Sequence, residues 1–303
     1  MAIIDFSTAR IAAILNTASG SCDLSSEEKV RALLTEAGIT DPKLWCGGAD
    51  HMEQAFSEAV RMKPDVLIVL GGDGTIRTGA EACDSSGPLL IPLPGGTMNM
   101  LPKAFYGDRT WEEALRETLA HPQVKSVSGA SANGYQFFIA AIAGGPALWA
   151  QAREALREGD LQAAAEKGAV AFQNMFATKV KYGFSEENRG EADAVTVICP
   201  LISEEMEETE RALEAAVITV ENAGEVLGLA ASGAFGKWRE DKHVMVTKTK
   251  AVTLEADEEI PLILDGETMD LGKKVRIEFV PEAFKALVPR PFIGNEPRDS
   301  DLS

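Results

Sequence analysis

No stretch of the 303-residue sequence approaches the roughly 20 consecutive apolar residues that a membrane-spanning helix needs. The first residues, MAIIDFSTARIAAILN, are interrupted by Asp5 and Arg10 and lack the continuous apolar core of a secretory signal. We therefore expect a cytoplasmic protein that is soluble or, at most, makes transient peripheral contact with a membrane.

Basic residues are also scarce. Lys and Arg together number 29, against 47 Asp and Glu, which gives a formal net charge of −18 at pH 7. Nucleic-acid binding requires clustered cations that displace phosphate counterions, so this balance argues against a nucleic-acid partner. The same deficit argues against a purely electrostatic attachment to anionic membranes.

Cysteine and histidine are too few and too scattered for most redox or metal motifs. The four cysteines, Cys22, Cys46, Cys83 and Cys199, form no C-x-x-C pair, which is typical of reduced thiols in a cytosolic protein. The three histidines are spread along the chain, and neither H-E-x-x-H nor G-x-S-x-G occurs. G-x-x-x-x-G-K-[ST] is missing as well, so the zinc, hydrolase and P-loop interpretations are excluded.

Short apolar runs alternate with helix patterns over the first part of the chain. Runs such as 66–70 are typical of buried strands, while capping patterns at Ser25, Asp50 and Thr110 mark the starts of helices. This alternation predicts a mostly parallel sheet covered by helices, in an α/β domain that extends over residues 1–125.

The remaining residues, 126–303, have a different pattern. Successive short strand-like runs with only occasional helices predict an antiparallel, sandwich-like β-rich domain. One long stretch, 146–178, has a helical pattern. The polar tail after about residue 293 is expected to be disordered. The chain is long enough for two such domains.

Glycine and small hydroxyl residues follow three of the predicted strands. The segments are N-T-A-S-G at 16–20, G-G-D-G-T at 71–75 and P-G-G-T-M-N at 94–99. In an open parallel sheet, ligands bind beyond the carboxyl ends of the strands. Because glycine lets backbone N–H groups come close to a phosphate, three such loops fit a polyphosphate. For the middle segment taken alone, a tight turn capped by Asp73 is an equally good interpretation.

Two acidic positions stand out beside these loops. A carboxylate near phosphates repels them unless a cation or proton lies between, so Asp73 is a candidate for handling Mg²⁺, water or a proton. The segment Asp265-Gly266-Glu267 follows the apolar run IPLIL. On its own this segment favours a hairpin turn, because Asp-Gly is a strong turn signal.

Taken together and in order, N-x-x-S-G, G-G-D-G-T, PLPGGTMN and the late D-G-E resemble the motifs of the diacylglycerol kinase catalytic family. This family includes bacterial lipid kinases, sphingosine kinases and ceramide kinases. The resemblance covers nearly the whole chain. It implies an NAD-kinase-like α/β domain that binds ATP, a β-rich substrate domain, and a lipid acceptor between the two. The implied activity is Mg²⁺-assisted transfer of a phosphoryl group from ATP to a hydroxyl of a diacylglycerol-like lipid.

The resemblance also implies roles for individual residues. The residues that would hold the nucleotide are Asn16, Ser19, Gly20, Gly71, Gly72, Gly74, Thr75, Gly95, Gly96, Thr97 and Asn99. Glu267 matches the general base of bacterial members, and Asp265 would orient it or join the magnesium network. Asp73 matches the base of sphingosine kinases, and either carboxylate could be tuned to that role by its neighbours. We expect Glu267 to be the base and Asp73 to lie on the phosphate–Mg²⁺ side.

Departures from the family pattern leave alternatives open. Arg77-Thr78 replace the usual Asn-Glu, and Gly145-Pro146-Ala147-Leu148 lacks the mid-chain Asp that sphingosine kinases use, which disfavours a sphingoid substrate. A glycine-rich run with D-G-L is also missing, so metal ligands stay unknown. A soluble kinase of the NAD-kinase type and a catalytically weakened nucleotide-binding member remain the alternatives.

A lipid substrate would require some contact with a membrane. Phe172 and Phe176 lie in the helical stretch 146–178 and could form part of a hydrophobic groove or lid. Core packing of an amphipathic helix is the more common cause of such a pattern. The oligomeric state is open, with a homo-oligomer among the alternatives.

Overall fold

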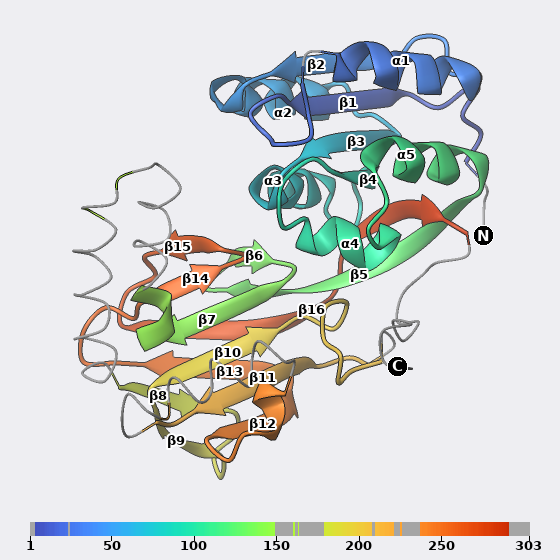
Figure 1. Ribbon diagram of the computed structural model, residues 1–303. Helices are drawn as coiled ribbons and strands as arrows, with labels where there is room; N and C mark the ends of the chain where they lie inside the picture. The colour runs from blue at the N-terminus through green and yellow to red at the C-terminus, as the bar shows by residue number, and fades with distance from the viewer. Residues whose placement is uncertain are drawn as a thin grey trace, which may run out of the picture. The chain divides into compact units, whose positions relative to one another are not determined.

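The computed structural model describes residues 4–23, 25–148, 160, 163, 179–207, 210–220, 225 and 237–290. Most of the stretch 146–178, including Phe172 and Phe176, lies outside the described residues, as does the tail after residue 293. The chain divides into two compact units (Figure 1). The first unit is Met1–Ser128 with Pro281–Ser303, and the second unit is Gly129–Val280.

A parallel sheet forms the centre of the first unit. Its strands are β1 (Ile11–Asn16), β2 (Lys43–Gly47), β3 (Val66–Gly71) and β4 (Leu89–Pro94), in the order β2-β1-β3-β4. Strands β1 and β3 are buried along their whole length, as expected for strands covered on both faces. The register pairs Leu15 with Leu70 and Leu70 with Leu93, so the loops after β1, β3 and β4 begin at the same level of the sheet.

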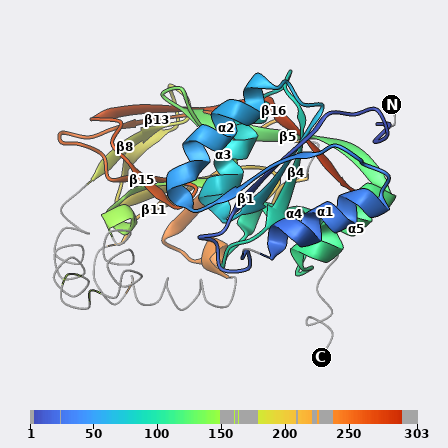
Figure 2. The same ribbon diagram turned by 90° about the horizontal axis from the view of Figure 1, so that it is seen from above.

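Helices cover both faces of this sheet (Figure 2). They are α1 (Ser26–Glu36), α2 (Met52–Arg61), α3 (Asp73–Cys83), α4 (Met100–Tyr106) and α5 (Trp111–Ala120), with a short 3₁₀ turn at Ala49–His51. Helix α2 packs beside α3 on one face, and α1 packs beside α5 on the other. The predicted α/β architecture is therefore confirmed.

Of the three predicted helix caps, only that at Thr110 is formed. The Thr110 hydroxyl accepts the N–H of Glu113 at 3.3 Å, and the Glu113 carboxylate accepts the N–H of Thr110 at 2.9 Å. The prediction at Ser25 was wrong because its hydroxyl donates to Asp23 at 2.6 Å instead. The prediction at Asp50 was also wrong, since Asp50 lies within the 3₁₀ turn that precedes α2.

Two long strands pass from one unit into the other. They are β5 (Pro122–Ala132) and β16 (Lys274–Pro289). Within the first unit β16 pairs with β4 in parallel, with Ala286 opposite Leu90. The end of the described chain thus adds a further strand to the sheet of the first unit.

The second unit is a sandwich of antiparallel strands. One layer has the order β12-β11-β10-β7-β14-β15, and the other contains β16-β13-β8-β9, with β6 on β5. The bounds are β6 (Tyr135–Phe137), β7 (Ala140–Gly144), β8 (Val180–Gly183), β9 (Arg189–Ala192), β10 (Ala194–Ile198), β11 (Leu213–Ile218), β12 (Val244–Thr249), β13 (Ala251–Glu255), β14 (Leu262–Leu264) and β15 (Glu267–Met269). Short 3₁₀ turns lie at Gly145–Leu148 and Trp238–Glu240.

Buried side chains from both layers form one core in this unit. Val195 and Val197 of β10 belong to the same cluster as Val252 of β13 and Ile277 of β16. Alternate residues of these strands point inward, which explains the short strand-like runs in the sequence. The predicted β-rich, antiparallel part of the fold is confirmed. None of the helices in the described part of the chain is long and apolar enough to span a membrane.

Candidate nucleotide-binding loops and carboxylates

Hydrogen bonds join the loops after β1, β3 and β4 into one layer. The N–H of Gly72 donates to the hydroxyl of Ser19 at 3.0 Å. The N–H of Ser21 donates to the carbonyl of Gly95 at 2.8 Å, and the N–H of Gly95 donates to the carbonyl of Gly71 at 2.9 Å. The three glycine loops that the sequence singled out therefore meet at the carboxyl edge of the parallel sheet, where such folds bind ligands.

Asn16 links the end of β1 to the first turn of α3. Its amide nitrogen donates to the hydroxyl of Thr75 at 2.9 Å, and its amide oxygen accepts the N–H of Ala18 at 3.0 Å. Asn16 is buried, so these bonds satisfy groups that water does not reach. The bond between Asn16 and Thr75 thus ties the loop after β1 to the start of α3. Gly74 lies between Asp73 and Thr75 in the same first turn.

Asn99 closes the loop after β4. Its backbone has φ 52°, in the left-handed region that Asn tolerates better than most residues. Its side chain pairs twice with Gly96: the amide oxygen accepts the N–H, and the amide nitrogen donates to the carbonyl, both at 2.7 Å. This turn holds Thr97 at the tip of the loop.

Some of the glycines are required because the loops approach so closely. A Cβ atom at Gly95 would lie 2.8 Å from the nitrogen of Gly71, and one at Gly96 would lie 2.7 Å from the Cα of Gly72. A Cβ atom at Gly71 would lie 2.6 Å from the side chain of Thr75. Such distances are far below the about 3.5–4.0 Å of normal carbon contacts, so side chains are excluded at these positions.

Two other glycines are not required by packing. A Cβ atom at Gly20 would have no neighbour within 4 Å, and one at Gly72 would have its nearest neighbour at 3.8 Å. Their bare backbone lies on the same layer and leaves space that a side chain would fill. This is the arrangement that the close approach of phosphate oxygens requires.

Asp73 connects the loop after β3 to the loop after β4. It is the first residue of α3, and its carboxylate accepts the N–H of Met100 at 2.7 Å and the N–H of Asn99 at 3.0 Å. Burial raises the pKa of Asp73, and these amide hydrogen bonds oppose that rise. Each oxygen of the carboxylate therefore already accepts a backbone hydrogen bond at the start of α4.

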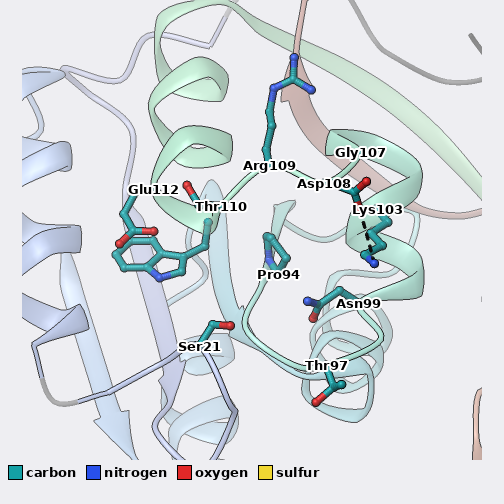
Figure 3. A pocket seen from close by; sticks show the side chains of 11 residues that line it. Ser21, Pro94, Thr97, Asn99, Lys103, Gly107, Asp108, Arg109, Thr110 and Glu112 are labelled. Atoms are coloured by element: carbon teal, nitrogen blue, oxygen red, sulfur yellow. Dashed lines mark ion pairs between the residues drawn. The ribbon is translucent and has the colours of Figure 1, made fainter. Parts of the chain in front are cut away.

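A cavity of about 370 Å³ lies beside this layer in the first unit (Figure 3). Thr97 and Asn99 line it together with Ser21, Lys103 of α4 and the segment 107–112. Figure 3 shows the Lys103 amine beside the carboxylate of Asp108, 3.5 Å away. A polar group bound to the loops could extend into this cavity.

The cavity residues Lys103 and Ser21 were missed by the sequence reasoning. The signal for Lys103 was its place one helical turn after Asn99, and the signal for Ser21 was its position directly after Gly20. Arg109 also borders the cavity, but Figure 3 shows its side chain pointing away from Asn99. It donates to the carbonyl of Tyr106 at 2.8 Å and pairs with Glu117 at 2.9 Å.

Asp265 and Gly266 form the two-residue turn between β14 and β15. Leu264 pairs directly with Glu267, and φ is 49° at Asp265 and 90° at Gly266, as in a type I′ hairpin. The hairpin that Asp-Gly favours is therefore formed. Glu267 begins β15 and is exposed.

The Asp265 carboxylate holds the chain segment that enters β7. It accepts the N–H groups of Phe138 at 2.8 Å, Ile139 at 2.9 Å and Ala140 at 3.0 Å. The N–H of Asp265 in turn donates to the carbonyl of Ala140 at 2.9 Å. These bonds fix the turn and with it the position from which Glu267 projects.

A metal ion has no ready-made cage in the part of the chain that the structure describes, since no three His, Cys, Asp or Glu side chains there could hold one. Mg²⁺ is commonly held by one or two carboxylates together with substrate phosphates.

A model of the diacylglycerol kinase catalytic domain matches residues 10–131. The match contains all three loops of the layer and both Asp73 and Lys103. Residues 10–131 belong to the diacylglycerol kinase catalytic domain family. The segment 265–267 lies beyond the match.

Solved structures share the fold of this diacylglycerol kinase domain and of the second unit. A diacylglycerol kinase from Bacillus anthracis str. Sterne matches with a TM-score of 0.67 and 20% identity, over 94% of this chain and 98% of that one. Two further structures from the same organism match at 20% identity over 94% of this chain and 99% of theirs, with TM-scores of 0.70 and 0.71. The search of curated proteins found no match.

Proposed function

We propose that the protein is an ATP-dependent lipid kinase that phosphorylates a hydroxyl of a diacylglycerol-like lipid, with Mg²⁺ accompanying the nucleotide. The observation that carries the proposal is the layer of three joined loops at the carboxyl edge of a parallel sheet, within a diacylglycerol kinase catalytic domain. The acceptor class is taken from the structurally similar diacylglycerol kinase, whose fold this chain shares.

The loops of the first unit bind and orient the phosphates of ATP in this proposal. Gly20 and Gly72 admit phosphate oxygens because no side chain covers their backbone. The first turn of α3 adds the partial positive charge of a helix N-terminus. When bound, Mg²⁺ would neutralise charge on the transferred phosphoryl group.

Glu267 is the proposed general base and accepts the proton of the acceptor hydroxyl at its carboxylate. Its side chain is exposed, which a group that must reach a substrate requires. Asp265 is the proposed positioning residue, because its carboxylate accepts three backbone hydrogen bonds and fixes the hairpin that carries Glu267. A base whose position is fixed in this way loses little entropy when it meets the hydroxyl.

The lipid acceptor also implies a transient contact with a membrane surface at the cytoplasmic side. The net charge of −18 disfavours electrostatic attachment, so the contact would depend on the lipid itself and on apolar groups. An oligomer is not required by any feature of the loop layer.

Transfer of γ-labelled phosphate from ATP·Mg²⁺ to a micellar panel tests the proposal. The panel contains diacylglycerol, monoacylglycerol, phosphatidylglycerol, sphingosine and ceramide, with NAD as a soluble acceptor. We expect label in diacylglycerol or a close analogue. Glu267→Gln should lower turnover by about 10²–10⁴-fold, the usual contribution of a general base. Glu258→Gln, which removes another exposed carboxylate of the second unit, is the matched control and should leave turnover unchanged.

Three results would contradict the proposal in different ways. Label in NAD alone would establish a soluble kinase instead. ATP binding with no transfer to any acceptor would indicate a nucleotide-binding protein without lipid kinase activity on this panel. Near wild-type turnover of Glu267→Gln would remove Glu267 from the role of base while leaving the lipid kinase activity in place.

A further inference from the structure

We infer that Asp73 is a positioning residue, which holds the loop after β4 and the start of α4 in the shape that binds ATP, and that it is not the proton acceptor. The inference rests on the proposed nucleotide-binding function. The hydrogen bonds of the Asp73 carboxylate, in the segment G-G-D-G-T, are the evidence for this positioning role. Both oxygens accept backbone N–H groups, from Met100 at 2.7 Å and from Asn99 at 3.0 Å.

A proton on Asp73 would weaken these two bonds. An ionised carboxylate offers acceptors on both oxygens, whereas the protonated form turns one oxygen into a donor. The protonated oxygen is the weaker acceptor, so the bond from Asn99 or from Met100 would weaken each time the group acted as a base. Both oxygens of Asp73 are therefore occupied in holding the backbone of residues 99 and 100, which leaves neither directed at a substrate hydroxyl.

The two bonds restrain elements that reach the candidate site. Asn99 pairs with Gly96 through its side chain, and its carbonyl accepts the N–H of Lys103 at 2.8 Å. Lys103 in turn lines the cavity beside the loops. Asp73 thus sets the position of the loop that carries Thr97 and of the helix that carries the lysine.

Without Asp73 the two N–H groups at the start of α4 lack their acceptor. Helix α4 has only seven residues, from Met100 to Tyr106, so the loss of its first restraints should matter more than in a long helix. We expect the loop and the helix to sample other positions, which weakens ATP binding while leaving the chemistry of the bound complex largely unchanged.

Asp73→Ala and Asp73→Asn test the inference. Calorimetry without any acceptor should show ATP·Mg²⁺ binding that is weaker by at least about tenfold in Asp73→Ala, which corresponds to losing one good hydrogen bond. Asp73→Asn keeps one side-chain acceptor and should bind with intermediate affinity. Hydrogen exchange should accelerate in peptides that cover residues 97–106, while peptides of the second unit keep their wild-type rates.

Kinetics separate positioning from base catalysis. With the lipid acceptor, Asp73→Asn should raise KM for ATP, retain most of kcat, and preserve the acid limb of the kcat–pH profile, which Glu267→Gln should abolish. Loss of the acid limb in Asp73→Asn with an unchanged KM would overturn the inference and make Asp73 the base. A lower melting temperature with unchanged ATP affinity would also overturn it, because the residue would then only stabilise the fold.

The outcomes distinguish this inference from the proposed function. If no acceptor is phosphorylated, the lipid kinase proposal fails, yet ATP affinity and hydrogen exchange still decide the role of Asp73. If wild-type protein binds no ATP, unchanged exchange of residues 97–106 in Asp73→Ala would refute the restraint itself.

Discussion

Replacing Gly96 by alanine tests whether the close approach of the glycine loops is needed for nucleotide binding. The added Cβ would lie 2.7 Å from the Cα of Gly72 and 3.2 Å from the side-chain oxygen of Asn99. Normal carbon contacts are about 3.5–4.0 Å, so the overlap with Gly72 is about 0.8–1.3 Å. Because the atom in the way belongs to the backbone, no side-chain rotation can relieve the clash.

The structure sets the size of the expected effect. Forcing an extra methyl group into a packed site typically costs about 1–3 kcal/mol. The loop after β4 can relieve the strain only by moving away from Gly72, which also strains the pairing of Gly96 with Asn99. If the whole cost appears in binding, the affinity for ATP falls by about 5-fold to 150-fold.

Gly20→Ala and Gly72→Ala are the matched controls. Their added Cβ atoms would meet nothing closer than 3.8 Å, so the unliganded variants should unfold in urea at the wild-type concentration. Both should nevertheless bind ATP·Mg²⁺ more weakly, because the methyl group occupies the space that we assign to phosphate oxygens. Gly96→Ala should instead show both a lower urea midpoint and weaker binding.

Two results would refute this reasoning. Wild-type stability and affinity in Gly96→Ala would show that the loops are not held at the spacing described here. Unchanged ATP affinity in both Gly20→Ala and Gly72→Ala would show that the phosphates do not approach the bare backbone of these two residues.

Three further predictions concern stability and reactivity. Arg239→Ala should destabilise the protein by about 3–5 kcal/mol in urea unfolding. The reason is that the fully buried carboxylate of Glu214, which lies 2.7 Å from the arginine, would lose its cation. A loss of stability under about 1 kcal/mol would contradict this. Thr110→Ala should cost about 1 kcal/mol by removing the cap of α5, Thr110→Ser should restore most of it, and equal stability of the two variants would argue against the cap. Cys83 and Cys199 are buried whereas Cys46 is half-buried, so mass spectrometry after brief alkylation should find Cys46 labelled before them. Early labelling of Cys83 would contradict its buried position.

The sequence was sufficient to predict the location of the loop layer. Apolar runs that end in Gly71-Gly72 and Gly95-Gly96 mark where the strands stop, and parallel strands place such ends at one edge of the sheet. The same local reasoning predicted the cap at Thr110 correctly and the cap at Ser25 wrongly. A nearby acceptor, Asp23, competes for the Ser25 hydroxyl, and a spacing rule does not include such competition.

Contacts between distant segments could not be predicted from the sequence. Nothing in G-G-D-G-T indicates that Asp73 accepts the N–H groups of Asn99 and Met100, because a backbone donor has no sequence signature. The pairing of Ala286 in β16 with Leu90 in β4 is a long-range contact of the same kind. Sequence patterns indicate which residues could bind a phosphate. The long-range contacts decide which of their acceptors and donors are already used within the protein and which can bind a ligand.

The aspartates of the two Asp-Gly pairs in this chain both accept backbone N–H groups through their carboxylates. Asp73 accepts two backbone N–H groups and Asp265 accepts three, so each carboxylate holds a segment of backbone that is distant in the sequence. Replacing Asp73, Asp265 or Glu267 would lower activity in every case, so lost activity alone cannot identify the base. The effects differ in kind: a positioning carboxylate changes affinity, exchange or stability, whereas a base changes kcat and its pH profile. Because the two aspartates use their oxygens to hold backbone, we expect the loss of the exposed Glu267 to lower kcat and change its pH profile while leaving ATP affinity and hydrogen exchange at their wild-type values.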